Sequence, residues 1–85
     1  MISIAIYGWN NTPKGLAVVA KIGNAYAFCI YERPDLRRPR CGWADSPELV
    51  ARALPSGVYY ISTPEREGEE EVRSREKIVE VLRRI

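Results

Sequence analysis

Two apolar segments separated by only two residues constrain the fold of this chain most strongly. Residues 16–22 read LAVVAKI, residues 25–31 read AYAFCIY, and Gly23-Asn24 lies between them. A two-residue Gly-Asn link between two apolar runs rich in β-forming residues is typical of a tight β-hairpin. We therefore predict a hairpin with a defined register. One side pairs Lys21 with Tyr26, Val19 with Phe28 and Ala17 with Ile30, and the other pairs Ile22 with Ala25, Ala20 with Ala27 and Val18 with Cys29.

The remaining segments predict two more strands and two helices. Residues 2–7 alternate, with Ile2, Ile4 and Ile6 on one side, and residues 58–63 (VYYIST) are rich in β-formers. Asp45-Ser46-Pro47-Glu48 predicts the start of a short helix that ends at Leu54, capped either by Ser46 with Pro47 at the first helical position or by Asp45 with Glu48 reaching back. Residues 69–85 place acids first and arginines last, as a helix dipole favours.

Together these segments predict one small α+β domain over residues 1–85. The expected order is β-β-β-α-β-α, with an antiparallel meander of three strands, a fourth strand, and helices on one face of the sheet. At 85 residues and 46% apolar content the chain has material for one modest core.

The composition gives no sign of a membrane or of export. No apolar run approaches the roughly 20 residues that span a bilayer, and MISIAIYGW lacks the basic start and the cleavage site of a signal peptide. We therefore expect a cytoplasmic protein with no membrane partner.

Metal and cofactor chemistry is poorly supported. The chain has two cysteines, Cys29 and Cys41, and no histidine, so a tetrahedral zinc site lacks ligands. We expect Cys29, in an apolar strand, to pack as a small hydrophobe. The sequence leaves open whether the two cysteines pair. We expect neither a metal nor a cofactor.

Two nuclease patterns lack residues that their chemistry requires. The predicted order resembles the opening of a ribonuclease-H-like fold, but residues 2–9 offer no carboxylate for a metal. Pro34-Asp35 resembles half of a PD-(D/E)xK signature, but no lysine follows an acid by two residues. Without histidine the commonest proton shuttle is missing as well. We therefore expect no enzyme, no catalytic residue and no small-molecule substrate.

A basic, proline-rich segment is the clearest functional feature. Residues 32–47 read ERPDLRRPRCGWADSP, with four arginines within eight positions, and the prolines predict an irregular loop. Residues 1–43 carry six bases against two acids, whereas residues 44–85 carry seven against nine. The basic N-terminal half suits an anionic partner. The competing interpretation is that the arginines form ion pairs with the glutamates at positions 65, 67 and 69–71.

Aromatic residues accompany these cations. Trp9 and Trp43 lie in predicted loops, and Tyr26 has Lys21 as a neighbour, which suggests an edge position for Tyr26. Stacking aromatics beside cations are the usual means of binding single strands without sequence preference. The alternative for Tyr26 and Phe28 is a place in the core. The predicted interface comprises Trp9, Lys14, Lys21, Tyr26, Arg33, Arg37, Arg38, Arg40 and Trp43.

Both faces of the hairpin are apolar, yet two short helices cover only one. An uncovered apolar face indicates a binding or subunit surface. We therefore expect a homo-oligomer, a dimer or tetramer, that binds single-stranded nucleic acid without sequence preference. The rival hypothesis is a protein-interaction module that uses the free sheet face and the C-terminal helix.

The chain resembles the ThermoDBP-related proteins of hyperthermophilic archaea. The resemblance rests on its size, on the segments IAIYGW and LAVVAKIGNAYAFCIY, on the loop RPDLRRPRCGW and on charged residues dominated by Arg and Glu. Those proteins bind single-stranded DNA as oligomers without an OB-fold. The resemblance therefore implies an archaeal, thermophilic DNA-binding protein, but it assigns no individual site residue.

Overall fold

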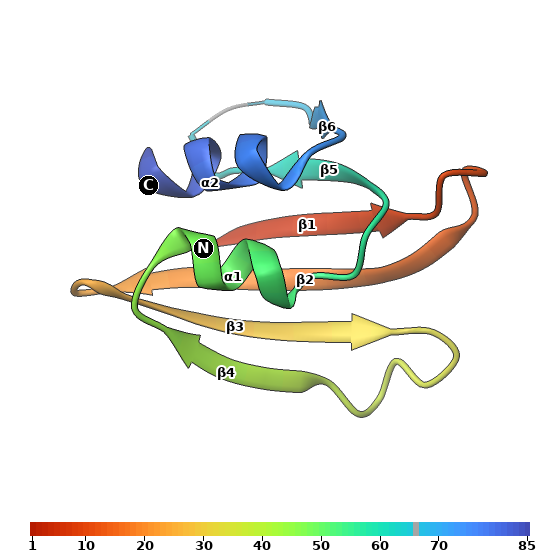
Figure 1. The fold of residues 1–85 in the computed structure, drawn as a ribbon, viewed down its shortest axis with the longest axis horizontal. Coiled ribbons are helices and arrows are strands. Elements are labelled where there is room, and N and C mark those ends of the chain that lie inside the picture. Colours follow the sequence, from red (N-terminus) through yellow and green to blue (C-terminus); the bar gives the residue numbers. More distant parts are fainter. Residues whose placement is uncertain (66) are drawn as a thin grey trace.

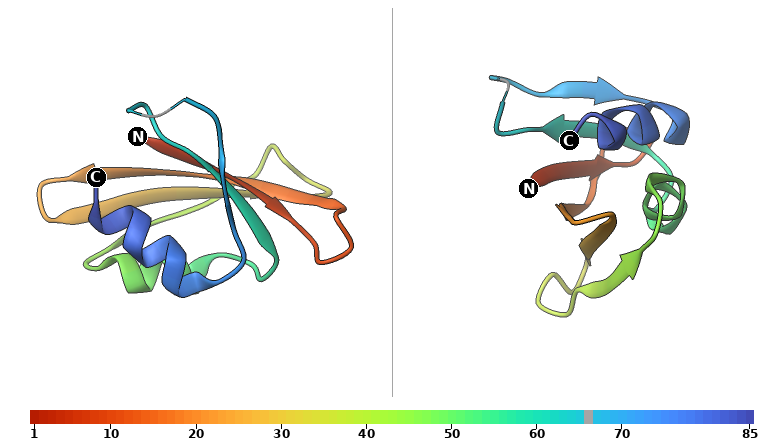
Figure 2. Two further views of the ribbon diagram at one scale, coloured as in Figure 1. Left: turned by 90° about the horizontal axis from the view of Figure 1, so that it is seen from above. Right: turned by 90° about the vertical axis from the view of Figure 1, so that its left-hand side faces the viewer.

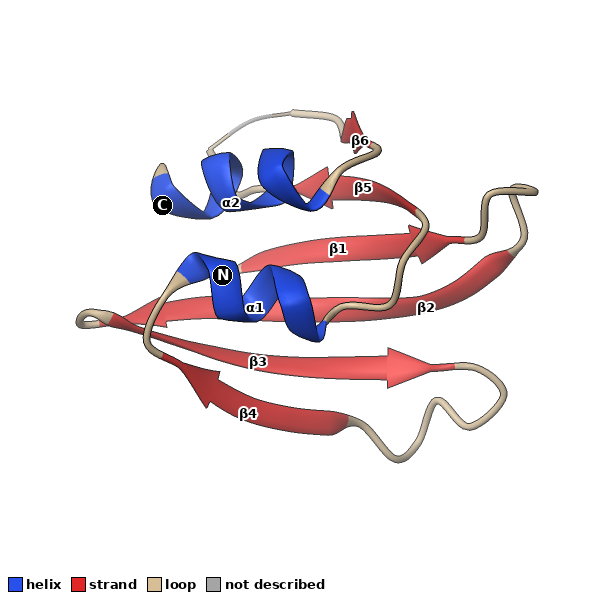
Figure 3. Cartoon of the chain, in the orientation of Figure 1, coloured by secondary structure: helices blue, strands red, loops and turns tan. Residues whose placement is uncertain are grey.

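The computed structural model describes residues 1–65 and 67–85 as a six-stranded antiparallel sheet with two helices (Figures 1 and 3). The elements in chain order are β1 (Ile2–Tyr7), β2 (Pro13–Ile22), β3 (Ala25–Glu32), β4 (Arg40–Ala44), α1 (Pro47–Ala53), β5 (Val58–Ser62), β6 (Glu70–Val72) and α2 (Arg75–Arg83). The strand order across the sheet is β4-β3-β2-β1-β5-β6, so β4 and β6 are its two edges.

The central hairpin has the predicted register. All six predicted pairs between β2 and β3 are present, from Ala17 with Ile30 to Ile22 with Ala25. Gly23 adopts a φ of +63°, which the hairpin turn requires and which glycine accommodates without a Cβ penalty. The α+β class is confirmed, and so is the start of α1, where the Ser46 hydroxyl accepts a hydrogen bond from the Leu49 N–H at 3.4 Å.

The predicted element order is wrong because two short strands were missed. β4 lies inside the segment that we expected to be an irregular loop, and β6 takes residues that we assigned to the last helix. That helix begins only at Arg75, after the Ser74 cap. Neither strand has a strong local signal. Each forms because a neighbouring strand supplies its backbone hydrogen-bond partners, which sequence periodicity does not report.

The two helices lie side by side on one face of the sheet (Figure 2). Beneath them Ile2, Ile4 and Ile6 of β1 are no more than 1% exposed, together with Val19 of β2 and Ile30 of β3. On β5 the buried Tyr59 hydroxyl donates to the Pro55 carbonyl at 2.6 Å, and burial raises the pKa of this phenol. The core thus uses one face only.

Contacts between the helices fix this layer. The Arg75 guanidinium donates to the carbonyls of Ala51 at 3.0 Å and Leu54 at 2.8 Å, and so supplies hydrogen-bond donors to carbonyls at the end of α1 that lack a helical partner. Glu48 at the start of α1 forms an ion pair with Arg83 at the end of α2. Within the described ranges, no helix is long and apolar enough to cross a membrane.

The Glu48–Arg83 pair predicts a pH-dependent contribution to stability. A backbone hydrogen bond at the helix start, and then the Arg83 guanidinium, hold the pKa of Glu48 below its ordinary value. A depressed folded-state pKa stabilises the fold above the unfolded-state pKa, and this contribution disappears as pH falls through the folded-state value. Glu48→Gln should therefore lower the thermal midpoint slightly near neutral pH and have no effect in strong acid. An equal deficit at both pH values would contradict the assignment.

A disulfide joins the two edge-side strands. Cys29 of β3 and Cys41 of β4 are directly opposite in register and are bonded, at a sequence separation of 12. The expectation that Cys29 packs as a free small hydrophobe is therefore wrong. The bond ties β4, the strand that carries Arg40 and Trp43, to the sheet.

Replacing both cysteines by serine should lower the free energy of unfolding by about 3 kcal/mol, the usual value for a loop of this length. Denaturant titration of the double variant measures this loss, and the wild type in reductant should unfold at the same midpoint. A double variant as stable as the oxidised wild type would show that the bond does not hold the edge.

Candidate nucleic-acid interface

The loop of residues 33–39, here called the arginine loop, connects β3 to β4. Its first residue is fixed by a hydrogen bond from the Arg33 N–H to the Lys14 carbonyl at 2.9 Å. Its turn is organised by Asp35, whose carboxylate accepts the Arg37 N–H at 3.1 Å and lies 3.6 Å from the Arg38 guanidinium. An aspartate that binds the backbone two residues ahead is a common turn device.

The arginine loop keeps an excess of positive charge. Arg40, the first residue of β4, donates to Glu32 at 2.8 Å and to the Ala53 carbonyl at 3.3 Å. Among the described residues Arg38 forms an ion pair with Asp35 alone, and its side chain is 89% exposed. Within residues 1–65 and 67–85, the guanidinium groups of Arg33 and Arg37 form no ion pair or hydrogen bond. Two arginines therefore remain available to an anionic ligand.

The expected neutralisation by the C-terminal glutamates is not found among the described residues. Glu71 pairs with Arg73 and Glu70 with Arg84, both within the β6 and α2 region. Because β6 and β4 are opposite edges of the sheet, these carboxylates lie far from the arginine loop. The sheet is thus basic at one edge and acidic at the other.

The sheet face turned away from the helices, here called the open face, is apolar and aromatic. Its residues alternate with the buried ones, and in register they form rows across the strands. Trp43 is 66% exposed and Leu16 is 42% exposed. A hollow of about 300 Å³ lies over the disulfide beside Trp43. The principal side chains of the open face are Leu16, Val18, Ala20, Ala27, Tyr31, Trp43 and Tyr60.

Tyrosines extend the open face beyond the predicted aromatics. Tyr60 makes an edge-on contact with Tyr7 at 5.3 Å between ring centroids. Tyr31 lies opposite Leu16 and comes two residues before Arg33. The alternation of β5 does predict that Tyr59 and Tyr60 face opposite sides. The contribution of Tyr31 was missed, although its alternation with the buried Ile30 carried the same signal.

Tyr26 is not available for stacking, contrary to expectation. It is only 5% exposed, and its hydroxyl donates to the Leu82 carbonyl at 3.5 Å. The prediction treated Lys21 as a sign of an edge, but Tyr26 is paired with Lys21 on one side and with Ala44 of β4 on the other. Since β4 extends the sheet, β3 is an interior strand and α2 covers Tyr26.

The two tryptophans are exposed but lie apart. Trp9, 63% exposed, lies in the loop between β1 and β2, at the same end of the strands as the arginine loop. Trp43 faces Ala27, which faces Ala20 near the other end of β2. From the start of β2 at Pro13, next to the loop of Trp9, to Ala20 in the row of Trp43 is seven residues, or about 23 Å of extended chain. One base cannot contact both indoles.

The two lysines are also separated. The Lys14 ammonium donates to the Ser56 carbonyl at 2.9 Å and lies beside Arg33 through their backbone contact. The Lys21 ammonium donates to the Ile85 carbonyl at 3.4 Å, at the far end of β2. Lys14 is therefore next to Arg33, at the end of the strands where the loops that carry Trp9, Arg37 and Arg38 also lie, whereas Lys21 lies at the opposite end.

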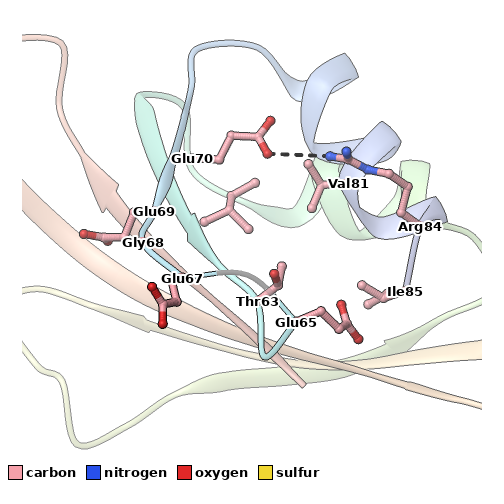
Figure 4. Close-up of a pocket in the computed structure, with 10 residues that line it drawn as sticks. Thr63, Glu65, Glu67, Gly68, Glu69, Glu70, Val81, Arg84 and Ile85 are labelled. Carbon is pink, nitrogen blue, oxygen red and sulfur yellow. Dashed lines mark ion pairs between the residues drawn. The ribbon is translucent and has the colours of Figure 1, made fainter.

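A cavity of about 410 Å³ at the opposite edge has the wrong charge for a polyanion (Figure 4). Glu65, Glu67 and Glu69 line it, and Glu70 within it is paired with Arg84 at 3.6 Å. Carboxylates that line a cavity repel phosphate. In the described parts of the chain, no cluster of Asp, Glu, Cys or His is placed to hold a metal.

Comparisons with protein-family models, with curated proteins and with solved structures find no match to this chain.

Proposed function

We propose that this protein binds single-stranded nucleic acid, without sequence preference, along the open face and the arginine loop. The observation that carries the proposal is the pair of guanidinium groups of Arg33 and Arg37, which have no partner among the residues that the structure describes, next to an exposed aromatic sheet face. Tyr31 precedes the arginine loop by two residues and Trp43 follows it by four. Bases on these rings would place their phosphates beside the loop.

The energetics of base stacking favour a single strand over a duplex as the ligand. Stacking on an aromatic ring is worth about 1–3 kcal/mol per base and requires bases that are not already stacked in a duplex. Phosphate contacts add a salt-dependent term through counterion release. Both helices cover the opposite face, so no helix is presented for groove reading (Figure 2). We therefore propose weak base discrimination.

We also propose that the protein works as a homo-oligomer, because the surface of one monomer accommodates few bases. The resemblance to ThermoDBP-related proteins supports DNA as the natural ligand and an archaeal, thermophilic source. An intracellular disulfide accords with that habitat, since cytosolic disulfides persist in hyperthermophiles. On this view the protein is cytoplasmic and neither an enzyme nor a cofactor carrier.

Replacing Arg37 and Arg38 by alanine should weaken binding of a labelled oligo-dT and reduce its salt dependence. Each lost phosphate contact lowers the slope of log affinity against log salt by about 0.7 for a single strand. Fluorescence anisotropy over a salt series measures both quantities, with duplex as competitor. The loss should be the same for a mixed sequence, because the arginines read no base.

A matched control is Arg73→Ala with Arg84→Ala. Arg73 pairs with Glu71 and Arg84 with Glu70, both at the β6 edge of the sheet, and the control removes the same two charges. It should leave affinity nearly unchanged. Equal losses in both double variants would show that net charge alone drives binding, and no loss in either would remove the arginine loop from the site.

The exposed apolar residues of the open face support a second candidate, a protein-interaction module. Ile22 and Trp43 are more than half exposed on this face. Light scattering and an A260/A280 ratio on unwashed protein separate the two candidates. Copurifying nucleic acid favours the first, and a clean protein whose mass rises with concentration favours the second.

A further inference from the structure

We propose that two copies of this chain join through their β4 edges, antiparallel and with Gly42 on the two-fold axis, to form one continuous twelve-stranded sheet. This dimer gives the homo-oligomer of the proposed function a defined interface, but its formation does not require nucleic acid. The backbone geometry of β4, the difference between the two sheet edges and the charges that flank β4 all favour it.

The outer side of β4 carries unpaired backbone groups. β4 is the last strand of the sheet, and no described element lies beyond it (Figures 1 and 3). The Cα atoms of Cys29 and Cys41 are 4.0 Å apart, as in the close pairs that exchange no backbone hydrogen bonds. Pairs alternate along an antiparallel ladder, so Trp43 and Ala27, two residues further along, also exchange no backbone hydrogen bonds. The N–H and C=O groups of Cys41 and Trp43 therefore point outward.

The two edges of the sheet are unequally protected. β6 has only three residues, two of which are glutamates, and Glu69 precedes it. A short, charged edge is the usual defence against strand addition. β4 has five residues and no charge from Cys41 to Ala44. Of the two edges, β4 is the one open to another strand.

The five residues of β4 are self-complementary. Antiparallel pairing about Gly42 uses the whole strand, with Arg40 opposite Ala44 and Cys41 opposite Trp43 of the second copy. The outward groups of Cys41 and Trp43 then form four backbone hydrogen bonds, two on each side of the axis. Gly42 places no side chain at the axis. Each exposed indole lies across from a disulfide sulfur, a favourable contact for an aromatic ring.

Charge selects a second copy over another extended strand. Continuing the register by one residue places Pro39 opposite Asp45 of the second copy, next in sequence to Arg38 and Arg40. Asp45 is exposed and has no ion pair or hydrogen bond among the described residues. An acid at one end of β4 and arginines at the other are complementary only in an antiparallel arrangement.

The pairing extends the open face. A two-fold axis perpendicular to the sheet keeps both open faces on the same side. The two arginine loops then lie at opposite ends of one surface, with both Trp43 rings near its middle. The helices stay together on the other side.

Sedimentation velocity of Trp43→Pro and Trp43→Ala tests the pairing. The wild type should form a species of twice 9.7 kDa at concentrations near 100 µM, a range that detects even weak dimers. Proline removes the outward N–H that β3 does not use, so an edge strand tolerates it. Alanine removes the ring and keeps the N–H. Trp43→Pro should weaken dimerisation at least about tenfold relative to Trp43→Ala, since two of four hydrogen bonds are lost.

Hydrogen exchange on the wild type gives an answer that needs no variant. The Cys41 and Trp43 amides should be protected at high concentration and exchange rapidly on dilution, because their only partner is the second copy. A wild type that stays monomeric, a dimer equally stable in both variants, or amides unprotected at every concentration would overturn the proposal. Oligo-dT binding is measured separately, so its failure would leave this result intact.

Discussion

The pairing of β3 with β4, closed by the Cys29–Cys41 disulfide, is the constraint on which the functional surface depends. Without β4, β3 would be an edge strand and Tyr26 would lie at the margin of the sheet. With β4 in place, Tyr26 is covered and hydrogen-bonded to α2. The same pairing fixes both ends of the arginine loop and holds Trp43 on the open face. One local pairing thus sets the position of the cations and of the main aromatic residue.

Charge is separated along the order of the strands. The arginine loop lies at the β4 edge, and the glutamates of residues 65–71 lie at the β6 edge, with four strands between the two. Carboxylates at that distance neutralise arginines poorly in water, since exposed charges are screened beyond about 10 Å at 0.1 M salt. A chain with a net charge of only +2 therefore presents a distinctly basic edge. The fold, and not the composition, produces this polarity.

Local signals in the sequence were sufficient for some elements and not for others. Gly23-Asn24 determined the register of the hairpin, and Ser46-Pro47 determined the start of α1, because both depend on neighbouring residues only. β4 and β6 each pair with the preceding strand, but across connections much longer than the two-residue turn of the β2–β3 hairpin, so no turn signal fixes their position or register. The acids at positions 69–71 resemble a first helical turn, yet residues 70–72 pair with β5.

The candidate site divides in the same way. Exposure of the two tryptophans and the excess charge of the arginine loop follow from local composition, and both are present. Burial of Tyr26, the disulfide, and the contribution of Tyr31 follow from the position of β4 and from the choice of covered face. The alternating pattern does not supply them, because it allows either face of the hairpin to be the core.

A titration of ¹⁵N-labelled protein with unlabelled oligo-dT, followed by two-dimensional NMR, tests the central claim most directly. The account predicts that the Trp43 indole and the backbone amides of Tyr31, Arg33 and Arg37 shift in a saturable manner, while the amides of α1 and α2 stay in place. Saturable shifts confined to the helices, or to the acidic cavity beside Glu67, would contradict it. So would the absence of any shift at low salt.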